Sequence, residues 1–181
     1  MKKRLRSLVM LSLVAGSLAF QSCGETKKGQ AESAVEEQQE INNTSEEITE
    51  AEFNNATIDE AFKKYILVKD ALVQTDAETT SEAAKELEAA LAEENSEIAK
   101  IAARIFEEQD VNVQREIFSE LTAAMDPVLK DAISSGKIYK QYCPMAFEGK
   151  GDYWYATSEE IRNPYYGDKM LKCGRVDETI Q

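Results

Sequence analysis

Apolar side chains recur at helical spacing through four successive stretches between residues 57 and 135, and this pattern constrains the fold more than any other feature. Residues three and four apart lie on one face of a helix, so each stretch forms one apolar stripe that faces a core. The stripe residues are Ile58, Phe62, Tyr65, Val68, Leu72 and Val73, then Ala84, Leu87 and Leu91, then Ile98, Ile101, Ile105 and Phe106, and finally Val113, Ile117, Leu121, Ala124 and Val128. Because short connections make sequential helices antiparallel neighbours, the pattern predicts a four-helix up-and-down bundle over residues 57–135.

Polar motifs indicate where these helices begin. A hydroxyl residue followed three residues later by glutamate has the spacing of a capping box. Two such pairs stand at the expected starts of the first two helices, Thr57 with Glu60 and Thr75 with Glu78. The third helix is expected to start after residue 95 or 96, and the fourth near residue 112. Within the fourth stripe, Asp126-Pro127 either kinks the helix or ends it, with Asp126 capping a short following helix.

The composition of the chain changes near Gly136. Seven of the eight Tyr and Trp residues and five of the eight glycines lie between this residue and the C-terminus. Three runs of β-prone residues predict strands over 138–142, 153–155 and 175–180. We therefore expect a mainly α protein whose bundle is followed by a small irregular α+β cap over residues 136–181, and we expect the bundle to fold independently of that cap.

The first 23 residues have the pattern of an export signal. Four basic residues precede an apolar run from Leu8 to Phe20, and Cys23 follows. The run is shorter than the roughly 20 apolar residues that span a bilayer, and it fits a signal peptide. The segment resembles the lipobox of bacterial lipoproteins, in which the cysteine becomes the acylated N-terminus, although Phe20 and Gln21 depart from that pattern. We therefore predict a signal peptide over residues 1–22 and lipidation of Cys23, with simple secretion as the alternative.

An acidic segment follows the predicted anchor. Residues 24–56 contain nine acidic residues and few large apolar ones. Such a composition buries too little apolar surface to offset chain entropy, so we expect a disordered tether over residues 23–56 and one ordered domain over residues 57–181. Gly24 is not the aspartate that retains lipoproteins at the inner membrane. The expected location is therefore the periplasmic face of the outer membrane.

Charge and residue usage exclude several functions. Without residues 1–22 the chain has 34 acidic and 17 basic residues, a net charge of −17. This charge repels phosphate backbones and argues against nucleic-acid binding. The chain contains no histidine, no nucleophile elbow and no phosphate-binding loop motif. We therefore do not expect an enzyme.

Two short sulfur motifs stand out in the cap, Cys143-Pro144-Met145 and Met170-Leu171-Lys172-Cys173. In an extended segment, residues two apart point to the same side, and on a helical turn residues three apart share a face. Each motif can therefore present two sulfurs together. If the two segments meet, two thiolates and two thioethers converge.

The chemistry of these sulfurs leaves two interpretations open. Soft thiolate and thioether ligands select Cu(I), and Ag(I) by the same argument. A zinc site would need four Cys or Cys/His ligands, which the chain does not offer here. The alternative is a Cys143–Cys173 disulfide, the default for two cysteines in an exported protein, with Met145 and Met170 as core residues. Composition alone favours the disulfide.

Three segments carry a family resemblance: Cys143-Pro144-Met145-Ala146, Gly151-Asp152-Tyr153-Trp154, and Ile161-Arg162-Asn163-Pro164-Tyr165-Tyr166-Gly167-Asp168-Lys169-Met170-Leu171-Lys172-Cys173-Gly174. They resemble a domain family of unknown function that occurs in lipoproteins and as an appendage on periplasmic adaptor subunits of copper and silver efflux pumps. The likeness covers about residues 57–181. The Cys-Pro-Met unit also resembles the start of short heavy-metal-binding modules, but the histidine that follows there is Ala146 here.

The resemblance implies a helical bundle followed by the cap, and its pump context implies heavy-metal handling. Four positions then match a metal site: Cys143, Met145, Met170 and Cys173. We expect a membrane-anchored periplasmic lipoprotein that binds Cu(I) or Ag(I) for metal homeostasis or efflux, with an efflux adaptor as its partner. The alternative is a non-metal protein-interaction module of the cell envelope with a structural Cys143–Cys173 disulfide.

Overall fold

The computed structural model describes residues 51–181 of the chain. The predicted signal peptide over residues 1–22, the predicted lipidation site Cys23 and most of the predicted tether lie outside these residues. Within the described part, no helix is both long enough and apolar enough to cross a membrane.

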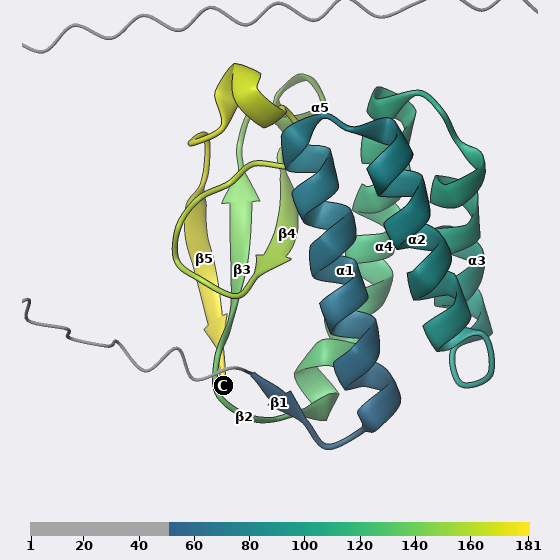
Figure 1. The fold of residues 1–181 in the computed structure, drawn as a ribbon. Helices are drawn as coiled ribbons and strands as arrows, with labels where there is room; N and C mark the ends of the chain where they lie inside the picture. Colours follow the sequence, from purple (N-terminus) through teal and green to yellow (C-terminus); the bar gives the residue numbers. More distant parts are fainter. Residues whose placement is uncertain (1–50) are drawn as a thin grey trace, which may run out of the picture. The chain divides into compact units, whose positions relative to one another are not determined.

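Four long helices form most of the described chain: α1 (Ala56–Gln74), α2 (Ala77–Leu91), α3 (Ser96–Glu107) and α4 (Val111–Ala132). Each helix packs against the next one along the chain, and α4 returns to contact α1 (Figure 1). Short connections make successive helices run in opposite directions. The prediction of a mainly helical protein built on a four-helix up-and-down bundle is confirmed.

Asparagine and aspartate, and not the predicted threonines, cap the first two helices. The side chain of Asn55 accepts a hydrogen bond from the amide of Thr57 at 2.8 Å. The side chain of Asp76 accepts hydrogen bonds from both the amide and the hydroxyl of Thr79. Asn and Asp are among the best N-cap residues because their short side chains reach the free amides of the first turn. The predicted capping boxes at Thr57 and Thr75 are therefore wrong.

Thr75 instead ends α1 in the left-handed conformation, with φ of 61°. A β-branched residue rarely adopts this conformation. The buried Arg115 of α4 supports it, because its guanidinium donates to the Thr75 hydroxyl at 3.0 Å and to the Leu72 carbonyl at 3.1 Å. The same guanidinium donates to the Pro164 carbonyl at 2.8 Å. Arg115 therefore joins the end of α1, helix α4 and the cap.

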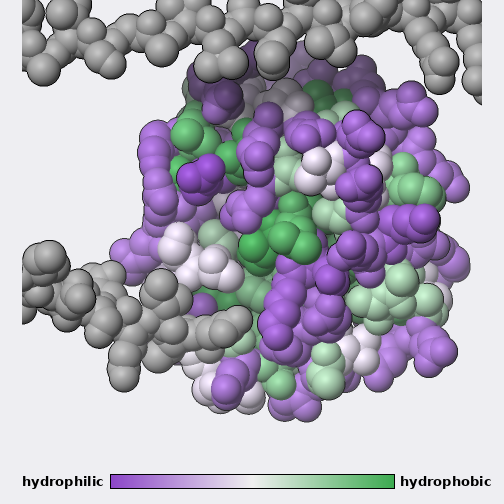
Figure 2. Space-filling model, in the orientation of Figure 1, coloured by the Kyte–Doolittle hydropathy of each residue, from purple (hydrophilic) through white to green (hydrophobic). Residues whose placement is uncertain are grey.

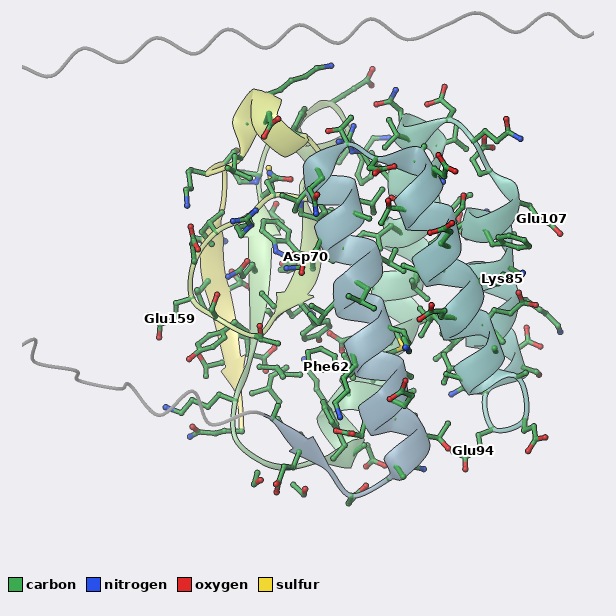
Figure 3. The ribbon with its side chains drawn as sticks, viewed as in Figure 1. Phe62, Asp70, Lys85, Glu94, Glu107 and Glu159 are labelled. Atoms are coloured by element: carbon green, nitrogen blue, oxygen red, sulfur yellow. The ribbon has the colours of Figure 1, made fainter. Side chains whose placement is uncertain are left out.

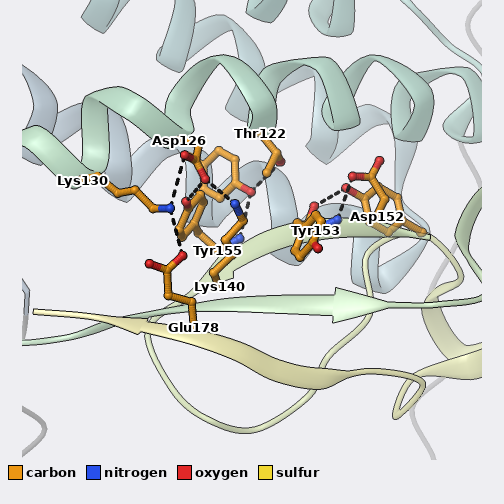
Figure 4. A network of polar contacts seen from close by, with 10 residues as sticks. Thr122, Asp126, Lys130, Lys140, Asp152, Tyr153, Tyr155 and Glu178 are labelled. Carbon is orange, nitrogen blue, oxygen red and sulfur yellow. Dashed lines mark hydrogen bonds and ion pairs between the residues drawn. The ribbon is translucent and has the colours of Figure 1, made fainter. Parts of the chain in front are cut away.

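Helix α4 continues through Pro127 and ends only at Ala132. The alternative in which the helix stops at Asp126 is therefore wrong. The Asp126 carboxylate does not cap a new helix. It accepts a hydrogen bond from the Tyr155 hydroxyl at 2.6 Å and forms an ion pair with Lys140 (Figure 4). These contacts tie the proline-containing part of α4 to the sheet of the cap.

Residues 51–181 also form two antiparallel sheets and two short helices. The cap sheet has the order β4-β3-β5, and a separate two-stranded sheet joins β1 to β2. The elements are β1 (Glu52–Phe53), β2 (Ile133–Ser135), β3 (Ile138–Cys143), α5 (Ala146–Gly149), β4 (Asp152–Ala156), the 3-10 helix η1 (Gly167–Met170) and β5 (Arg175–Ile180). The three strands of the cap sheet match the predicted ones.

Strands β1 and β2 correct the predicted boundaries at both ends of the bundle. β1 and the first residue of α1 precede residue 57, so regular structure begins inside the segment predicted as tether. β2 occupies the last residues of the segment predicted as helical. The two strands pair with each other, with Glu52 opposite Ser135. This pairing closes the lower end of the bundle in Figure 1.

The bundle and the cap share one core. The hydroxyl of Tyr65 in α1 hydrogen-bonds Thr122 of α4 at 2.7 Å and accepts the amide of Tyr155 in β4 at 3.1 Å. The ring of Phe118 in α4 packs against Tyr65 and Tyr165, with centroids 5.1 and 6.1 Å apart. The buried residues of helices and sheet form one continuous cluster. The independent folding of the bundle stays a prediction, and this shared core argues against it.

Charge is distributed unevenly over this fold. Residues 57–135 contain 18 acidic and 8 basic residues, whereas residues 136–181 contain seven of each. Hydrophilic side chains cover most of the face seen in Figure 2, and the apolar patches between them are separate. Figure 3 shows Glu94, Glu107 and Glu159 extending from the edges of the molecule. The excess negative charge of the described chain therefore belongs to the bundle.

Candidate metal centre

The register of the cap sheet brings Cys143 and Cys173 together. Tyr142 of β3 pairs with Arg175 of β5. Antiparallel chains advance in opposite directions, so Cys143 comes level with Gly174, the residue after Cys173. The two Sγ atoms lie 3.3 Å apart. Both cysteines are free thiols.

This Sγ–Sγ separation lies between the length of a disulfide bond and the separation of two thiolates on one tetrahedral metal ion of zinc's size. A disulfide bond is about 2.05 Å long. Zinc–thiolate bonds are about 2.3 Å long, so two sulfurs on one tetrahedral metal of this size lie about 3.8 Å apart. The observed 3.3 Å is near enough to both values for either to form through a modest side-chain shift.

The two thiols differ in their exposure. Cys143 is fully buried, whereas Cys173 is half-buried and reaches the surface. The hydrogen bond with Cys143 raises the pKa of the Cys173 thiol, and burial and the charge of Cys143 add to this rise, while the amide of Met145 opposes it. A metal that binds here must displace protons from the thiols, so its affinity should increase with pH.

Met145 does not share the buried side of Cys143. Strand β3 ends at Cys143, and Met145 has a helical backbone with φ of −92° and ψ of −12°. The predicted extended geometry over residues 143–145 is therefore wrong. Met145 is 50% exposed, whereas Cys143 is 0% exposed. The backbone of Met145 still lies near the thiols, because its amide lowers the pKa of the Cys173 thiol, and its carbonyl accepts the Tyr166 hydroxyl at 2.6 Å.

Met170 and Cys173 lie on one turn, as their spacing predicted. The amide of Cys173 donates to the Met170 carbonyl at 2.9 Å, directly after η1. Met170 is half-buried. Across residues 51–181, no three or more His, Cys, Asp or Glu side chains are grouped so that they could hold a metal ion. A soft metal at this position would therefore depend on the two cysteines, with the methionine thioethers as additional donors.

The connection that follows Met145 has a strained backbone. Phe147 and Glu148 have φ of 48° and 59°, in the left-handed region that residues with a side chain rarely adopt. The ring of Phe147 packs against Tyr165, with centroids 5.1 Å apart, and this packing helps to hold the turn. Strain of this kind persists only where surrounding contacts impose it, and it is frequent at functional sites.

Trp154 borders the segment that carries Cys173. It is fully buried and stands opposite Gln141 in the register of β3 and β4. A methyl group on Gly174 would lie 2.9 Å from the Trp154 ring. The indole N–H of Trp154 and the Oε1 atom of Gln141 have no hydrogen-bond partner. The Trp154 ring therefore lies against the backbone of Gly174, the residue after Cys173.

Asn163 and Arg115 are the polar residues of this region that the sequence analysis missed. The Asn163 side chain donates to the Cys173 carbonyl at 2.7 Å and accepts the Tyr165 amide at 2.8 Å. The available signal was the Asn-Pro pair, because asparagine side chains in turns bond backbone groups two residues on. Arg115 gave no local signal, since its partners Leu72 and Pro164 are remote in sequence.

The fold and the site together define a helical bundle whose C-terminal cap presents a pair of neighbouring thiols. Residues 61–136 match a family described as "Protein of unknown function (DUF3347)". The matched segment runs from α1 through β2 and ends where the cap begins, so the sulfur residues lie outside it. Neither the curated proteins nor the solved structures give a match to the chain.

Proposed function

We propose that this protein binds Cu(I) or Ag(I) through Cys143 and Cys173 as part of metal handling or efflux. The observation that carries the proposal is the pair of free thiols with Sγ atoms 3.3 Å apart, one of which reaches the surface. Thiolates are the ligands that select Cu(I) over harder cations. The chain contains no histidine, so sulfur is its donor for a soft metal.

Met145 and Met170 are proposed as the secondary ligands. Met145 is exposed and follows Cys143 by two residues, while Met170 precedes Cys173 on the same turn. An exposed thioether on an unbranched side chain adjusts easily, because methionine has three rotatable bonds. These residues would capture the metal at the surface and pass it to the thiols.

The proposed setting is the cell envelope. The basic and apolar start that ends at Cys23 supports a lipid anchor, and the acidic segment behind it supports a tether at the periplasmic face of the outer membrane. The acidic bundle would raise the local concentration of cations around the cap. The proposed partner is a heavy-metal efflux adaptor that accepts the ion.

An anaerobic Cu(I) competition titration against a chelating dye tests the proposal. The wild type should bind one Cu(I), and Cys143→Ser or Cys173→Ser should weaken binding by at least about 100-fold, because a thiolate is lost. Met145→Leu and Met170→Leu roughly conserve volume and should weaken it less. The proposal fails if the wild type competes no better than the double-serine variant.

The same titration repeated at pH 6 and pH 8 provides a second check. The pKa of Cys173 is raised by its hydrogen bond with Cys143, so protons compete with the metal throughout this range. Affinity should increase with pH by up to about tenfold per pH unit for each proton released. A flat profile would show that the thiols are not the ligands.

One alternative function retains support from the same geometry. The short Sγ–Sγ distance also allows a Cys143–Cys173 disulfide, which would make the cap a rigid protein-interaction module of the envelope. Thiol counting and metal analysis on protein isolated from the periplasm separate the two. Fully oxidised, metal-free protein would favour the interaction module.

A further inference from the structure

Cys143 and Cys173 are held in place by different means. Cys143 ends β3 and pairs with Asp152 of β4, so the sheet fixes its backbone. Cys173 lies between η1 and β5, outside any helix or strand. The position of its sulfur therefore depends on the contacts of the loop that precedes β5 as well as on the pairing of β5 with β3.

Asn163 makes the contacts that close this loop. Its side-chain NH₂ group donates to the Cys173 carbonyl at 2.7 Å, and its Oδ1 atom accepts the Tyr165 amide at 2.8 Å. Its backbone amide donates to the Leu171 carbonyl at 2.9 Å, and its carbonyl accepts the Gly167 amide at 3.0 Å. Asn163 is 0% exposed. One buried residue thus binds both ends of the segment that leads into Cys173.

The loop is itself attached to the bundle. Arg115 donates to the carbonyl of Pro164, the residue after Asn163, at 2.8 Å. Gly167 lies so close to the end of α1 that a methyl group there would stand 2.4 Å from the Thr75 hydroxyl. Asn163 therefore connects the segment that carries Cys173 to the bundle, whereas the sheet holds Cys143.

We infer that Asn163 is the positioning residue that holds Cys173 beside Cys143. The effect passes through the Cys173 carbonyl, so Asn163 does not touch a metal or a reacting sulfur. The part of the inference that concerns metal affinity rests on the proposed function. The part that concerns the geometry of the thiols does not, because disulfide formation measures that geometry without any metal.

The substitution Asn163→Asp tests this inference most directly. Aspartate keeps the oxygen that accepts the Tyr165 amide and replaces the NH₂ donor with an oxygen that faces the Cys173 carbonyl. Two acceptors cannot hydrogen-bond, and a buried carbonyl left without its donor is destabilised. The segment around Cys173 should move away. Gly174→Ala displaces the same segment by a different route, because its methyl group would meet Trp154 at 2.9 Å and the Tyr142 carbonyl at 3.0 Å.

Equilibration of the reduced protein with oxidised glutathione measures the geometry. One protein thiolate attacks glutathione disulfide, forms a mixed disulfide and releases one glutathione thiolate. The second protein thiolate then attacks the mixed disulfide, forms the Cys143–Cys173 bond and releases the second glutathione. Two protein thiols are oxidised and one glutathione disulfide is reduced. The equilibrium constant of this exchange gives the effective concentration of the Cys143 thiol relative to the Cys173 thiol.

Asn163→Asp and Gly174→Ala should each lower this effective concentration at least about tenfold. Gln114→Glu is the matched control, because Gln114 is also fully buried and its NH₂ group donates to the backbone carbonyls of Ala77 and Glu108 in the bundle. The control should lower the melting temperature and leave the effective concentration unchanged. Circular dichroism checks that each variant is folded.

The outcomes separate the inference from the proposed function. If folded Asn163→Asp and Gly174→Ala keep the wild-type effective concentration, or if Gln114→Glu lowers it equally, the inference is overturned. A wild type with a low effective concentration also overturns it. In a parallel Cu(I) titration, Asn163→Asp should bind at least about tenfold more weakly. If the wild type binds no Cu(I), the metal function fails while the glutathione result still decides the part played by Asn163.

Discussion

The bundle is held together by apolar stripes that repeat every few residues, whereas the cap adds to the shared apolar core a set of hydrogen bonds between residues far apart in the chain. In the bundle, Leu72 and Leu87 are buried on stripes visible in the sequence. In the cap, Asn163 reaches Cys173 and the bundle residue Arg115 reaches Pro164. Repeated apolar contacts tolerate substitution, but a buried hydrogen bond requires its particular partner. The bundle therefore supports the cap, and the geometry of the cap depends on particular pairs of residues.

The charges follow the same division. The bundle has an excess of acidic residues, while acidic and basic residues balance in the cap. Both neighbouring thiols and both flanking methionines lie in the cap or on its turns. The cap carries the proposed metal site. An acidic partner would therefore meet less electrostatic repulsion at the cap than at the bundle.

Removal of the cap should reduce the stability of the protein more than any single substitution. A chain that ends at Gly136 loses Tyr155 and Tyr165, which pack against Tyr65 and Phe118 of the bundle. These bundle residues would face water, and the helices should lose their cooperative melting transition because the core is shared. Circular dichroism with temperature measures this. A sharp transition close to that of the whole protein would show that the bundle stands alone.

Asp126→Asn should have an intermediate effect, because this carboxylate joins α4 to the cap sheet (Figure 4). Burial raises the pKa of Asp126, but hydrogen bonds from Lys140 and Tyr155 outweigh it and leave the pKa below its usual value. A lowered carboxyl pKa contributes stability above the unfolded pKa of about 4, and this is lost as the pH falls through the folded pKa. The variant should lose about 1–2 kcal/mol at pH 7.

Urea denaturation at pH 7 and pH 3 measures that loss. The difference between wild type and Asp126→Asn should narrow at pH 3, because the carboxyl group of the unfolded chain, with a pKa of about 4, then binds a proton and the stabilisation from the lowered folded-state pKa decreases. Asp131→Asn is a suitable control, since Asp131 lies about one turn further along α4 and is exposed. An equal loss in the control, or a loss that does not change with pH, would contradict a specific link through Asp126.

Glu120→Gln should have the smallest effect. Glu120 accepts two hydrogen bonds from Arg104 between α3 and α4, but both side chains are about half exposed. Exposed ion pairs contribute about 0–1 kcal/mol and are screened by salt. Urea denaturation at low and high ionic strength checks this. A loss as large as that of Asp126→Asn would show that ion pairs within the bundle matter as much as those that join it to the cap.

The sequence predicted those features that depend on neighbouring residues. The four helices, the three cap strands and the turn that joins Met170 to Cys173 each follow from local spacing. It did not predict the caps Asn55 and Asp76, because several polar residues compete at each helix start and the sequence does not rank them. The exposed position of Met145 was also missed, since β3 ends at Cys143, two residues before Met145, and does not orient it.

The proximity of the two cysteines was predicted from the sequence, but the contacts that surround them were not. Cys143 and Cys173 were paired from sequence and lie together in the structure. The contacts that Asn163 and Arg115 add around them join residues that are remote in the chain or that meet only after the loop has folded. Sequence spacing carries no information on such contacts, so their importance appears only in three dimensions.

Trp154 gives this arrangement a practical consequence. It is the sole tryptophan of the whole chain, it is fully buried, and its ring lies against the backbone just after Cys173. All of the tryptophan fluorescence of the protein therefore originates from a residue close to the thiol pair. A heavy ion or a newly formed sulfur bond at that position should change the emission intensity without any attached dye. Trp154 is thus an intrinsic fluorescence probe of changes at the thiol pair.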